Sequence, residues 1–256
     1  MKEQTTFIDT EHKKILNLDI DENGNFIAFT EGNIVLTKLL KLKIEVTLET
    51  PIIRKLDDEL FLLTDTRTTE EMNGYIFSFD GNLITTFLAG DGIQDIVVQN
   101  KKIIITYFDE GVFGGSGPNN DGLSVFDFYG NQLWGFNSKV KYNFIDDCYC
   151  ICKHETNKVL FYAYSSFNLY ELNLDTLQVE VYKTPDDFIG SSSISSRNDN
   201  VYFHSSYNDK YSFFQWNRKS NQVQKMGNYN SDLTGIKNGI FFTYGDNGFT
   251  TVDLTK

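Results

Sequence analysis

The feature that most constrains the fold of this chain is a short pattern that recurs along its whole length. In each copy two apolar residues flank one residue of any kind, and a small polar residue usually follows. Successive copies are about 38–49 residues apart, a spacing typical of repeat units that each form one small antiparallel sheet. The six copies are Leu36–Leu39, Phe77–Asp80, Phe126–Tyr129, Leu172–Asp175, Phe214–Asn217 and Val252–Thr255.

A more hydrophobic run precedes every copy of the pattern. Near-continuous apolar runs suit strands that are buried on both faces, as the middle strands of stacked sheets are. Turn-forming residues such as Gly130-Asn131 separate the runs, and no segment of useful length has helical periodicity. The runs are Phe26–Phe29, Leu60–Leu63, Ile103–Thr106, Val159–Tyr162, Val201–His204 and Ile240–Thr243.

Six copies of a four-stranded unit predict an all-β fold, a six-bladed β-propeller that forms a single domain over residues 1–256. The last copy ends near Leu254 and leaves no residues for an outer strand, whereas Thr5–Asp9 is a spare strand ahead of the first blade. We expect this N-terminal strand to complete the last blade, because closing the ring removes two free sheet edges.

The turn Asp21-Glu22-Asn23-Gly24-Asn25-Phe26 resembles the Asp-x-x-Gly-Asn-apolar turn of six-bladed propellers of the NHL and gluconolactonase types. The loop that begins Tyr107–Gly114 is similar to a feature of uncharacterised bacterial propellers. The resemblance covers the whole chain and implies a propeller fold. It implies no activity, because the Glu, Asn and Asp metal ligands of the gluconolactonase type have no counterparts here. The Gly-His and Trp-Asp pairs of the WD type are also absent.

The formal net charge of -12 excludes several classes of partner. Nucleic-acid binders need clustered Lys and Arg for phosphate contacts, and anionic membrane surfaces attract basic segments. A basic partner or a cation fits the charge. The first residues contain no apolar run typical of a secretory signal, and no stretch approaches the ~18 apolar residues of a membrane span. We therefore expect a soluble, cytoplasmic protein.

Cys148, Cys150 and Cys152 alternate along a predicted strand, so all three should point to one face, about 6.5–7 Å apart. A tetrahedral zinc site needs its sulfur atoms much closer together. We expect the three residues to pack as small apolar side chains between sheets.

Other possible sites have a simpler structural explanation. The stretch Asp19–Gly24 matches the first half of a calcium loop, but Thr30 stands where such loops have a bidentate Glu, so we expect a hairpin turn. The run Ser191–Ser193 lacks a G-x-S-x-G elbow, which gives a serine hydrolase little support. His204 is expected at the end of a middle strand, and Asp127 is expected to have a structural role, bonding backbone or a neighbouring blade.

Loop length places the candidate site over blades two and three. Blade two has a long connection, Asp65–Asn73, and blade three has a longer one, Asp109–Asp121. Both should emerge on the same face, beside the connection Ala89–Gly92, and long loops on a rigid scaffold often carry function. The candidate binding residues are Asp65, Arg67, Asp91, Asp109, Glu110 and Phe113.

Two classes of function fit these observations. The first is a non-catalytic platform for a protein, peptide or glycan ligand, which uses the loops over blades two and three and needs no cofactor. The alternative is a divalent-metal-dependent hydrolase, lactonase or lyase with an acidic site at the axial mouth, where carboxylates would bind Ca²⁺ or Mg²⁺. Its oxygen ligands would come from Asp65, Asp91, Asp109, Glu110 and Asp246. The fold does not decide between them, and the lack of a recognisable catalytic set favours binding.

The adjacent carboxylates Asp109 and Glu110 give the most specific expectation about the site. They should reach a common pocket at the end of strand Ile103–Tyr107. Because like charges repel, one of the two should have a raised pKa unless a cation neutralises the pair. The competing expectation is that Asp109 bonds only local backbone N–H groups.

Overall fold

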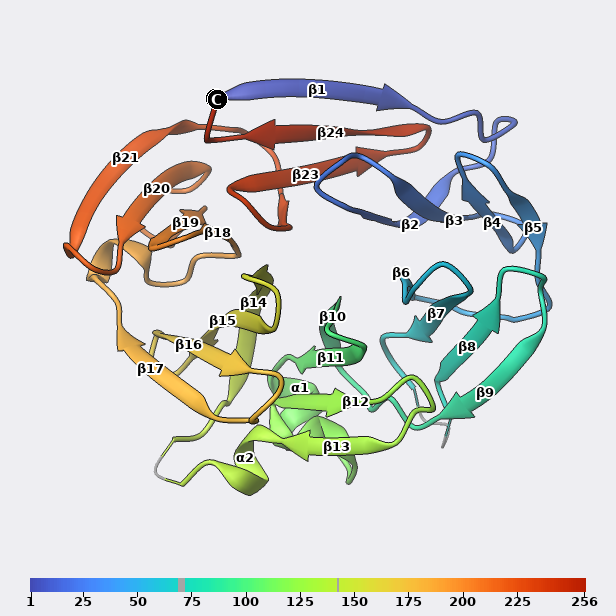
Figure 1. The fold of residues 1–256 in the computed structure, drawn as a ribbon, viewed down its shortest axis with the longest axis horizontal. Helices are drawn as coiled ribbons and strands as arrows, with labels where there is room; N and C mark the ends of the chain where they lie inside the picture. The colour runs from blue at the N-terminus through green and yellow to red at the C-terminus, as the bar shows by residue number, and fades with distance from the viewer. Residues whose placement is uncertain (69–71, 142) are drawn as a thin grey trace.

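The computed structural model describes residues 1–68, 72–141 and 143–256. Six antiparallel sheets of four strands each stand in a ring, so the protein is a six-bladed β-propeller, as the sequence predicts (Figure 1). The blades are numbered here in chain order, and the last one contains both ends of the chain. None of the helices in the described ranges is long and apolar enough to cross a membrane.

Each blade begins at the ring axis and adds strands outward. Blade one contains β2 (Ile15–Ile20), β3 (Phe26–Thr30), β4 (Ile34–Thr37) and β5 (Lys41–Lys43); blade two contains β6 (Pro51–Lys55), β7 (Leu60–Asp65), β8 (Gly74–Ser78) and β9 (Leu83–Phe87); blade three contains β10 (Ile93–Gln99), β11 (Lys102–Tyr107), β12 (Leu123–Phe126) and β13 (Gln132–Gly135).

The remaining three blades follow the same order. Blade four contains β14 (Asp147–His154), β15 (Lys158–Tyr164), β16 (Asn168–Asn173) and β17 (Val179–Lys183); blade five contains β18 (Ser193–Arg197), β19 (Asn200–His204), β20 (Ser212–Asn217) and β21 (Gln222–Asn228); blade six contains β22 (Thr234–Gly235), β23 (Ile240–Gly245), β24 (Gly248–Asp253) and, outermost, β1 (Lys2–Phe7). A short helix α2 (Phe136–Lys139) and a turn of 3-10 helix η2 (Asp186–Phe188) lie between blades.

The hydrophobic core lies between neighbouring blades rather than within one of them. Ile104 of blade three and Phe161 of blade four, both fully buried, belong to one cluster, and Phe203 of blade five packs with Leu160 of blade four. The apolar runs recognised in the sequence are these middle strands, buried on both faces. Full burial of such a side chain contributes about 1.5–3 kcal/mol, so blade-to-blade packing holds the ring together.

The N-terminal strand closes the ring, as predicted. β1 pairs with β24 in antiparallel register from Lys2 opposite Asp253 to Phe7 opposite Gly248. The amino group of Met1 donates a hydrogen bond to the carbonyl oxygen of Lys256 at 3.1 Å, so the two chain ends lie together (Figure 1). The strand begins earlier than the predicted Thr5 and ends before Asp9.

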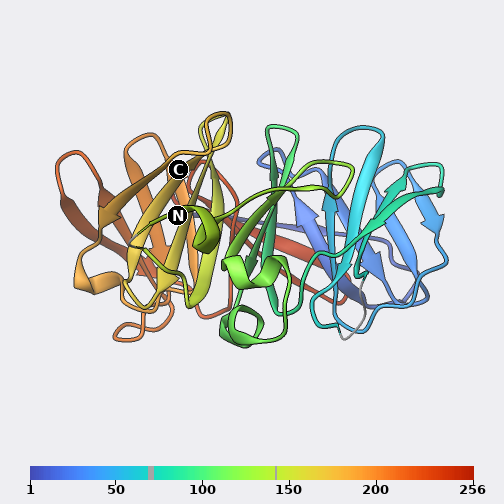
Figure 2. The same ribbon diagram turned by 90° about the horizontal axis from the view of Figure 1, so that it is seen from below.

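The long connection of blade three is folded into regular structure. It contains a short helix, α1 (Asp109–Phe113), and a 3-10 turn, η1 (Pro118–Asp121), which protrude from one face of the ring (Figure 2). Asn119 Nδ2 donates to the carbonyl oxygens of Gly111 at 2.6 Å and Gly114 at 3.0 Å, and Asn120 Nδ2 donates to that of Val112 at 2.9 Å. The asparagines thus satisfy the backbone carbonyls that an open loop would leave to solvent.

Two turns share one carboxylate arrangement. Asp127 Oδ1 accepts hydrogen bonds from the backbone N–H groups of Tyr129 at 2.8 Å and Asn131 at 2.9 Å, and its Oδ2 accepts from Asn131 Nδ2. Asp21 accepts the equivalent bonds from Asn23 and Asn25. The structural role expected for Asp127 is therefore confirmed, and so is the hairpin turn expected at Asp19–Gly24.

The prediction that three cysteines share one face is wrong. Cys148 pairs with Ala163 and Cys150 with Tyr162, so a β-bulge leaves Tyr149 between them without a register partner. The bulge turns Cys148 into the core between blades three and four, while Cys150 and Cys152 face the core between blades four and five. All three are buried free thiols, and burial raises their pKa, which agrees with the expected packing role.

Candidate functional site

The two faces of the ring carry different connections. The connections from the second to the third strand of each blade, and from each blade to the next, emerge on the face that also bears α1 (Figure 2). This face is called the loop face below. The opposite face carries the other, mostly tight turns and is called the hairpin face. Blades two and three place their longest connections on the loop face as predicted, although residues 69–71 lie outside the described residues.

Three of the six predicted site residues come together over blades two and three. The guanidinium of Arg67 bonds to Asp91 Oδ1 at 3.1 Å through Nε and to Glu110 Oε2 at 2.6 Å through Nη1. It also lies 5.3 Å from the centre of the Phe108 ring. The hydrogen bond to Glu110, together with the charge of Asp91, raises the pKa of Arg67. The pair of long loops is thus joined by a partly exposed ion-pair cluster.

The other three predicted residues lie apart from this cluster. Asp65 accepts hydrogen bonds from the backbone N–H groups of Glu49 at 2.7 Å and Thr50 at 2.9 Å, which anchors the chain as it enters blade two. Asp109 Oδ1 accepts from the backbone N–H of Glu110 at 2.7 Å. Phe113 is largely exposed, and its ring stacks 6.3 Å from that of Phe144.

A carboxyl group with a raised pKa beside these loops is that of Asp147, a residue that the sequence reasoning missed. Partial burial at the start of β14, together with the nearby charges of Asp109 and Asp146, raises the pKa of Asp147 to about 6. The sequence predicted repulsion between Asp109 and Glu110. Because Arg67 pairs with Glu110, the charge of Asp109 acts instead on Asp147 of blade four. The doublet Asp146-Asp147 at the start of a strand was the available sequence signal.

Substitution of Asp147 should stabilise the protein at neutral and higher pH. Because the folded-state pKa lies above the unfolded value, the folded state binds the proton more tightly, and its advantage disappears as the pH rises through 6. We expect Asp147→Asn to raise the free energy of unfolding at pH 8 by about 1–2 kcal/mol, after allowance for solvent screening.

Denaturant unfolding of both proteins at pH 4 and pH 8 checks this expectation. The difference should be much smaller at pH 4, where Asp147 is protonated in the folded state and, with an unfolded-state pKa of 3.8, about half protonated in the unfolded state. Asp186→Asn, at an exposed position on the same face, is the matched control and should show no such pH-dependent gain. An Asp147→Asn variant with the same stability as the wild type at pH 8 would contradict the assigned repulsion.

A group of aromatic side chains, called the tyrosine cluster below, lies over blades four and five on the loop face. It consists of Tyr149, Tyr164, Phe167 and Tyr207. The rings of Tyr149 and Tyr164 stack at 6.2 Å, Phe167 contacts both edge-on, and the hydroxyls of Tyr149 and Tyr207 share a hydrogen bond. Tyr207 is 63% exposed and Tyr164 is 43% exposed.

Beside the tyrosine cluster a cavity of about 230 Å³ runs down the ring axis. Its lining comes from the inner strands of all six blades, mainly from the ends nearest the loop face, so the cavity belongs to that face. Tyr149 is part of both the cluster and the cavity wall. Other polar or aromatic lining residues are Asn17, Gln94, Ser192, Ser193, Phe242 and Tyr244.

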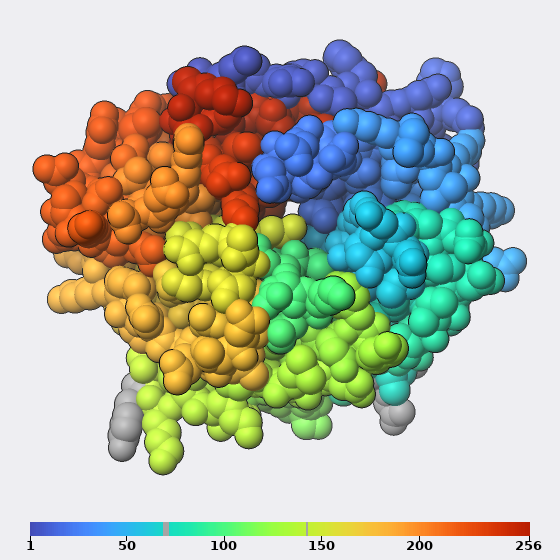
Figure 3. Space-filling model, viewed as in Figure 1, coloured from blue at the N-terminus to red at the C-terminus, as the bar shows by residue number. Residues whose placement is uncertain are grey.

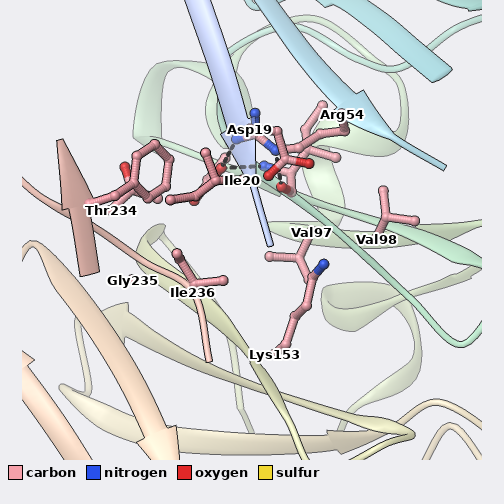
Figure 4. Close-up of a pocket in the computed structure, with 12 residues that line it drawn as sticks. Asp19, Ile20, Arg54, Val97, Val98, Lys153, Thr234, Gly235 and Ile236 are labelled. Carbon is pink, nitrogen blue, oxygen red and sulfur yellow. Dashed lines mark hydrogen bonds and ion pairs between the residues drawn. The ribbon is translucent and has the colours of Figure 1, made fainter. Parts of the chain in front are cut away.

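An ion pair separates this axial cavity from a smaller one. Arg54 Nη2 bonds to Asp95 Oδ1 at 2.6 Å, and both residues line both cavities. The second cavity, about 30 Å³, lies toward the hairpin face, where Asp19 stands beside Arg54 and Lys153 lies on the other side (Figure 4). Figure 3 shows the hairpin face, and the ring is hollowed at its centre there.

The axial ion pair is held in place by backbone groups. Arg54 donates from Nε to the carbonyl oxygen of Ile96 at 2.6 Å and from Nη1 to that of Ile53 at 2.7 Å and to Asn17 Oδ1 at 3.2 Å. Burial lowers the pKa of Arg54, but the charges of Asp95 and Asp19 outweigh this effect and the pKa is raised, so the guanidinium stays charged. Burial raises the pKa of Asp95 more than the ion pair lowers it.

The candidate metal ligands of the enzyme alternative do not all converge, although Asp91 and Glu110 meet at Arg67. Asp65 and Asp91 are engaged as described above, on different parts of the loop face, and none of the six predicted site residues lines the axial cavity. Within residues 1–68, 72–141 and 143–256, no group of three or more His, Cys, Asp or Glu side chains is arranged to hold a metal ion.

Comparison with known proteins supports the architecture alone. No protein-family model and no curated sequence matches the chain. Hsv2 from Kluyveromyces lactis is similar in structure, with a TM-score of 0.59 and 10% identity over 91% of this chain and 70% of that chain. A catalytically inactive variant of virginiamycin B lyase from Staphylococcus aureus, solved with quinupristin, gives a TM-score of 0.52 at 9% identity over 98% and 99% of the two chains.

A third similar structure is the extracellular domain of the putative one component system BT4673 from B. thetaiotaomicron. Its TM-score is 0.57 at 11% identity, over 98% of this chain and 33% of that chain. Identities this low establish a shared fold and no shared activity. The chain is therefore a six-bladed β-propeller similar in fold to a lyase, to Hsv2 and to part of a one component system.

Proposed function

We propose that the protein is a non-catalytic binding module whose loop face engages a basic segment of a protein or peptide partner. The loops over blades two and three would form one side of the site and the tyrosine cluster the other. The observation that carries the proposal is the presence of exposed tyrosines beside carboxylates that have no cationic partner.

The charge of the loop face supports a basic partner. Asp146 directly precedes the first strand of blade four and Asp147 begins it, and the exposed Asp186 and Asp187 precede the first strand of blade five. In the part of the chain that the structure describes, none of these four carboxylates forms an ion pair. Arg67, the nearest arginine on the long loops, is already neutralised by Asp91 and Glu110. Such a surface attracts Lys and Arg side chains and repels acidic ones.

The aromatic side chains support recognition of cationic groups at short range. Tyr164, Tyr207 and Phe113 are exposed on the same face as these carboxylates. A Lys or Arg side chain over an exposed aromatic ring gains about 0.5–1 kcal/mol. A neutral glycan would also stack on such rings, but it would leave the acidic charge without a counterpart, so we favour a basic peptide segment.

The experiment measures binding of a fluorescein-labelled penta-lysine peptide by anisotropy at low salt, with penta-glutamate as the charge-reversed probe. The double variant Tyr164→Ala/Tyr207→Ala should weaken penta-lysine binding roughly fivefold to tenfold. The matched control is Tyr129→Ala, which removes a 75% exposed ring from the hairpin face. The proposal fails if penta-glutamate binds equally well, or if Tyr129→Ala has the same effect as the double variant.

A second pair of variants tests the charge. Asp186→Asn/Asp187→Asn removes two carboxylates from the loop face, and Glu22→Gln/Asp199→Asn removes two from turns on the hairpin face, so the net charge changes equally. Only the first pair should weaken binding if the site lies on the loop face. Equal effects of both pairs would indicate attraction to the net charge alone and would contradict the proposal.

One observation favours the enzyme alternative, a hydrolase or lyase with an acidic axial mouth. A carboxyl group with a pKa near 6, as at Asp147, can act as a general acid or base close to neutral pH. Metal analysis of the purified protein separates the two functions. Copurification of a stoichiometric divalent cation that Asp147→Asn loses would favour the enzyme, whereas binding of penta-lysine that is insensitive to chelation would favour the module.

A further inference from the structure

We propose that the axial cavity binds a primary ammonium group carried on a short alkyl chain. Such a group belongs to a free alkylamine or to a lysine side chain of a bound partner. In the second case the inference deepens the proposed function, because it names the chemical group that the loop face would receive at its centre.

The size of the cavity limits the ligand. At about 230 Å³ it is smaller than the ~300–1,000 Å³ of pockets that enclose a drug-sized molecule. The Arg54–Asp95 pair lines its deep end, and its open end adjoins the tyrosine cluster through Tyr149. A small cavity with an ion pair at its deep end suits a short chain whose charged terminus can reach that pair.

The hydrogen bonds that Arg54 and Asp95 already form indicate that the polar end of the ligand is a cation. Arg54 uses four of its five N–H groups on Ile96, Ile53, Asn17 and Asp95, so little of it is left for an anion. Asp95 accepts from both Arg54 and the backbone N–H of Ile96 through Oδ1 alone. Among the described residues its Oδ2 has no donor, although a carboxylate oxygen ordinarily accepts more than one hydrogen bond.

A second acceptor in the cavity wall also lacks a partner. Ser193 Oγ is buried, and the residue is only 1% exposed, yet Oγ forms no hydrogen bond within the described residues. An ammonium group brings three N–H donors and no acceptor. It therefore matches these two acceptors better than a carboxylate or a carbonyl group would, and pairing would remove the cost of leaving Ser193 Oγ buried and unsatisfied.

The surroundings of the cavity favour a cation over its whole path. Tyr149, Phe242 and Tyr244 line the wall, and aromatic ring faces attract ammonium groups. Asp147 begins β14 two residues before Tyr149, which is the lining residue where the cavity meets the tyrosine cluster. Arg54 and Asp95 are the charged residues in the lining, while Lys153 lies beyond them in the smaller cavity. A cation that approaches from the loop face thus meets carboxylates before it meets any unpaired base.

The test uses n-pentylamine as the probe and 1-pentanol as its uncharged counterpart. Ile52, Ile151, Leu18 and Leu233 line the cavity, so their methyl resonances in an NMR spectrum report its occupation. We expect saturable shifts of these methyl groups with n-pentylamine at pH 7. 1-Pentanol should bind about tenfold more weakly or not at all, because it brings no charge to Asp95. Equal affinity of the two probes, or no methyl shift with the amine, would overturn the inference.

Two variants locate the effect. Ser192→Trp places a large side chain at an exposed position of the cavity lining without touching the buried groups, and should abolish the shifts. Asp95→Asn keeps the shape of the side chain and should weaken amine binding about tenfold. Retention of wild-type binding in a folded Ser192→Trp variant would place the probe elsewhere and contradict the inference, even if Asp95→Asn fails to fold.

The same samples separate this inference from the proposed function. Binding of penta-lysine that depends on the tyrosine cluster but not on Ser192→Trp, with no n-pentylamine shifts, would refute the axial site and leave the binding module intact. Saturable n-pentylamine shifts without tyrosine-dependent binding of penta-lysine would refute the module and support the axial site for a free amine.

Discussion

Deletion of residues 1–7 should lower the melting temperature by about 10–20 °C, because it reopens the ring. The strand β1 forms six register pairs with β24, and its side chains are almost all exposed, so its contribution comes from backbone pairing rather than from core burial. At roughly 1 kcal/mol for each backbone hydrogen bond the loss is about 5 kcal/mol, and 1 kcal/mol shifts the melting temperature of a domain this size by about 2–4 °C. A free edge on β24 would also promote association between molecules.

A cross-link provides the complementary experiment. Thr5 and Thr250 are register partners whose hydroxyl groups lie 3.0 Å apart, a position compatible with disulfide geometry. Oxidised Thr5→Cys/Thr250→Cys should be more stable than its reduced form by about 2–4 kcal/mol, because the bond prevents the ring from opening. The account of closure would be wrong if the deletion left the melting temperature unchanged or if oxidation gave no gain.

The second large effect is expected at a buried ion network between blades four and five, near the hairpin face. Arg218 of blade five bonds to Glu171 Oε2 of blade four at 2.7 Å, and Lys158 bonds to Glu171 Oε1 at 2.7 Å. Arg218 also bonds to His154 Nε2 at 3.1 Å, and Ser196 Oγ lies 2.9 Å from His154 Nδ1. Both Glu171 and Arg218 are buried, at 6% and 10% side-chain exposure.

Glu171→Ala should destabilise the protein by about 3–5 kcal/mol, measured by denaturant unfolding. It leaves the guanidinium of Arg218 buried without its carboxylate, which is the costly way to break such a pair. The matched control is Asp58→Asn, which breaks an ion pair of the same 2.7 Å length to Lys55 at a side chain that is 97% exposed, and no measurable change is expected there. A loss from Glu171→Ala no larger than that of the control would show that the network does not join the blades.

The sequence revealed the fold because repetition is visible without knowledge of contacts. The middle strands are apolar on both faces, so one hydrophobic run identified each blade. The missing outer strand of the last blade predicted that β1 completes it. The bulge at Tyr149 could not be predicted, because its signal is the pairing of Cys148 and Cys150 with a different strand.

The candidate site was predicted only in part. Loop length identified Arg67, Asp91 and Glu110 on one face. It gave no information on which charges form ion pairs, so the pairing of Arg67 with both carboxylates was unexpected. The axial cavity was missed because the inner strands are less continuously apolar than the middle strands, whose apolar runs were the signal of each blade. A signal was present: Asp19, Arg54 and Asp95 place a charge within the first strand of three successive blades, where a charge must find a partner across the axis.

The measurement that most directly tests the proposed binding face is an NMR map of penta-lysine on the protein. Backbone amide and methyl resonances are followed during the titration. The account predicts saturable changes around the tyrosine cluster and at Asp146, Asp186 and the lining of the axial cavity, with none at the turns of Asp21 and Asp127 on the hairpin face. Changes spread evenly over both faces, or confined to the hairpin face, would contradict it.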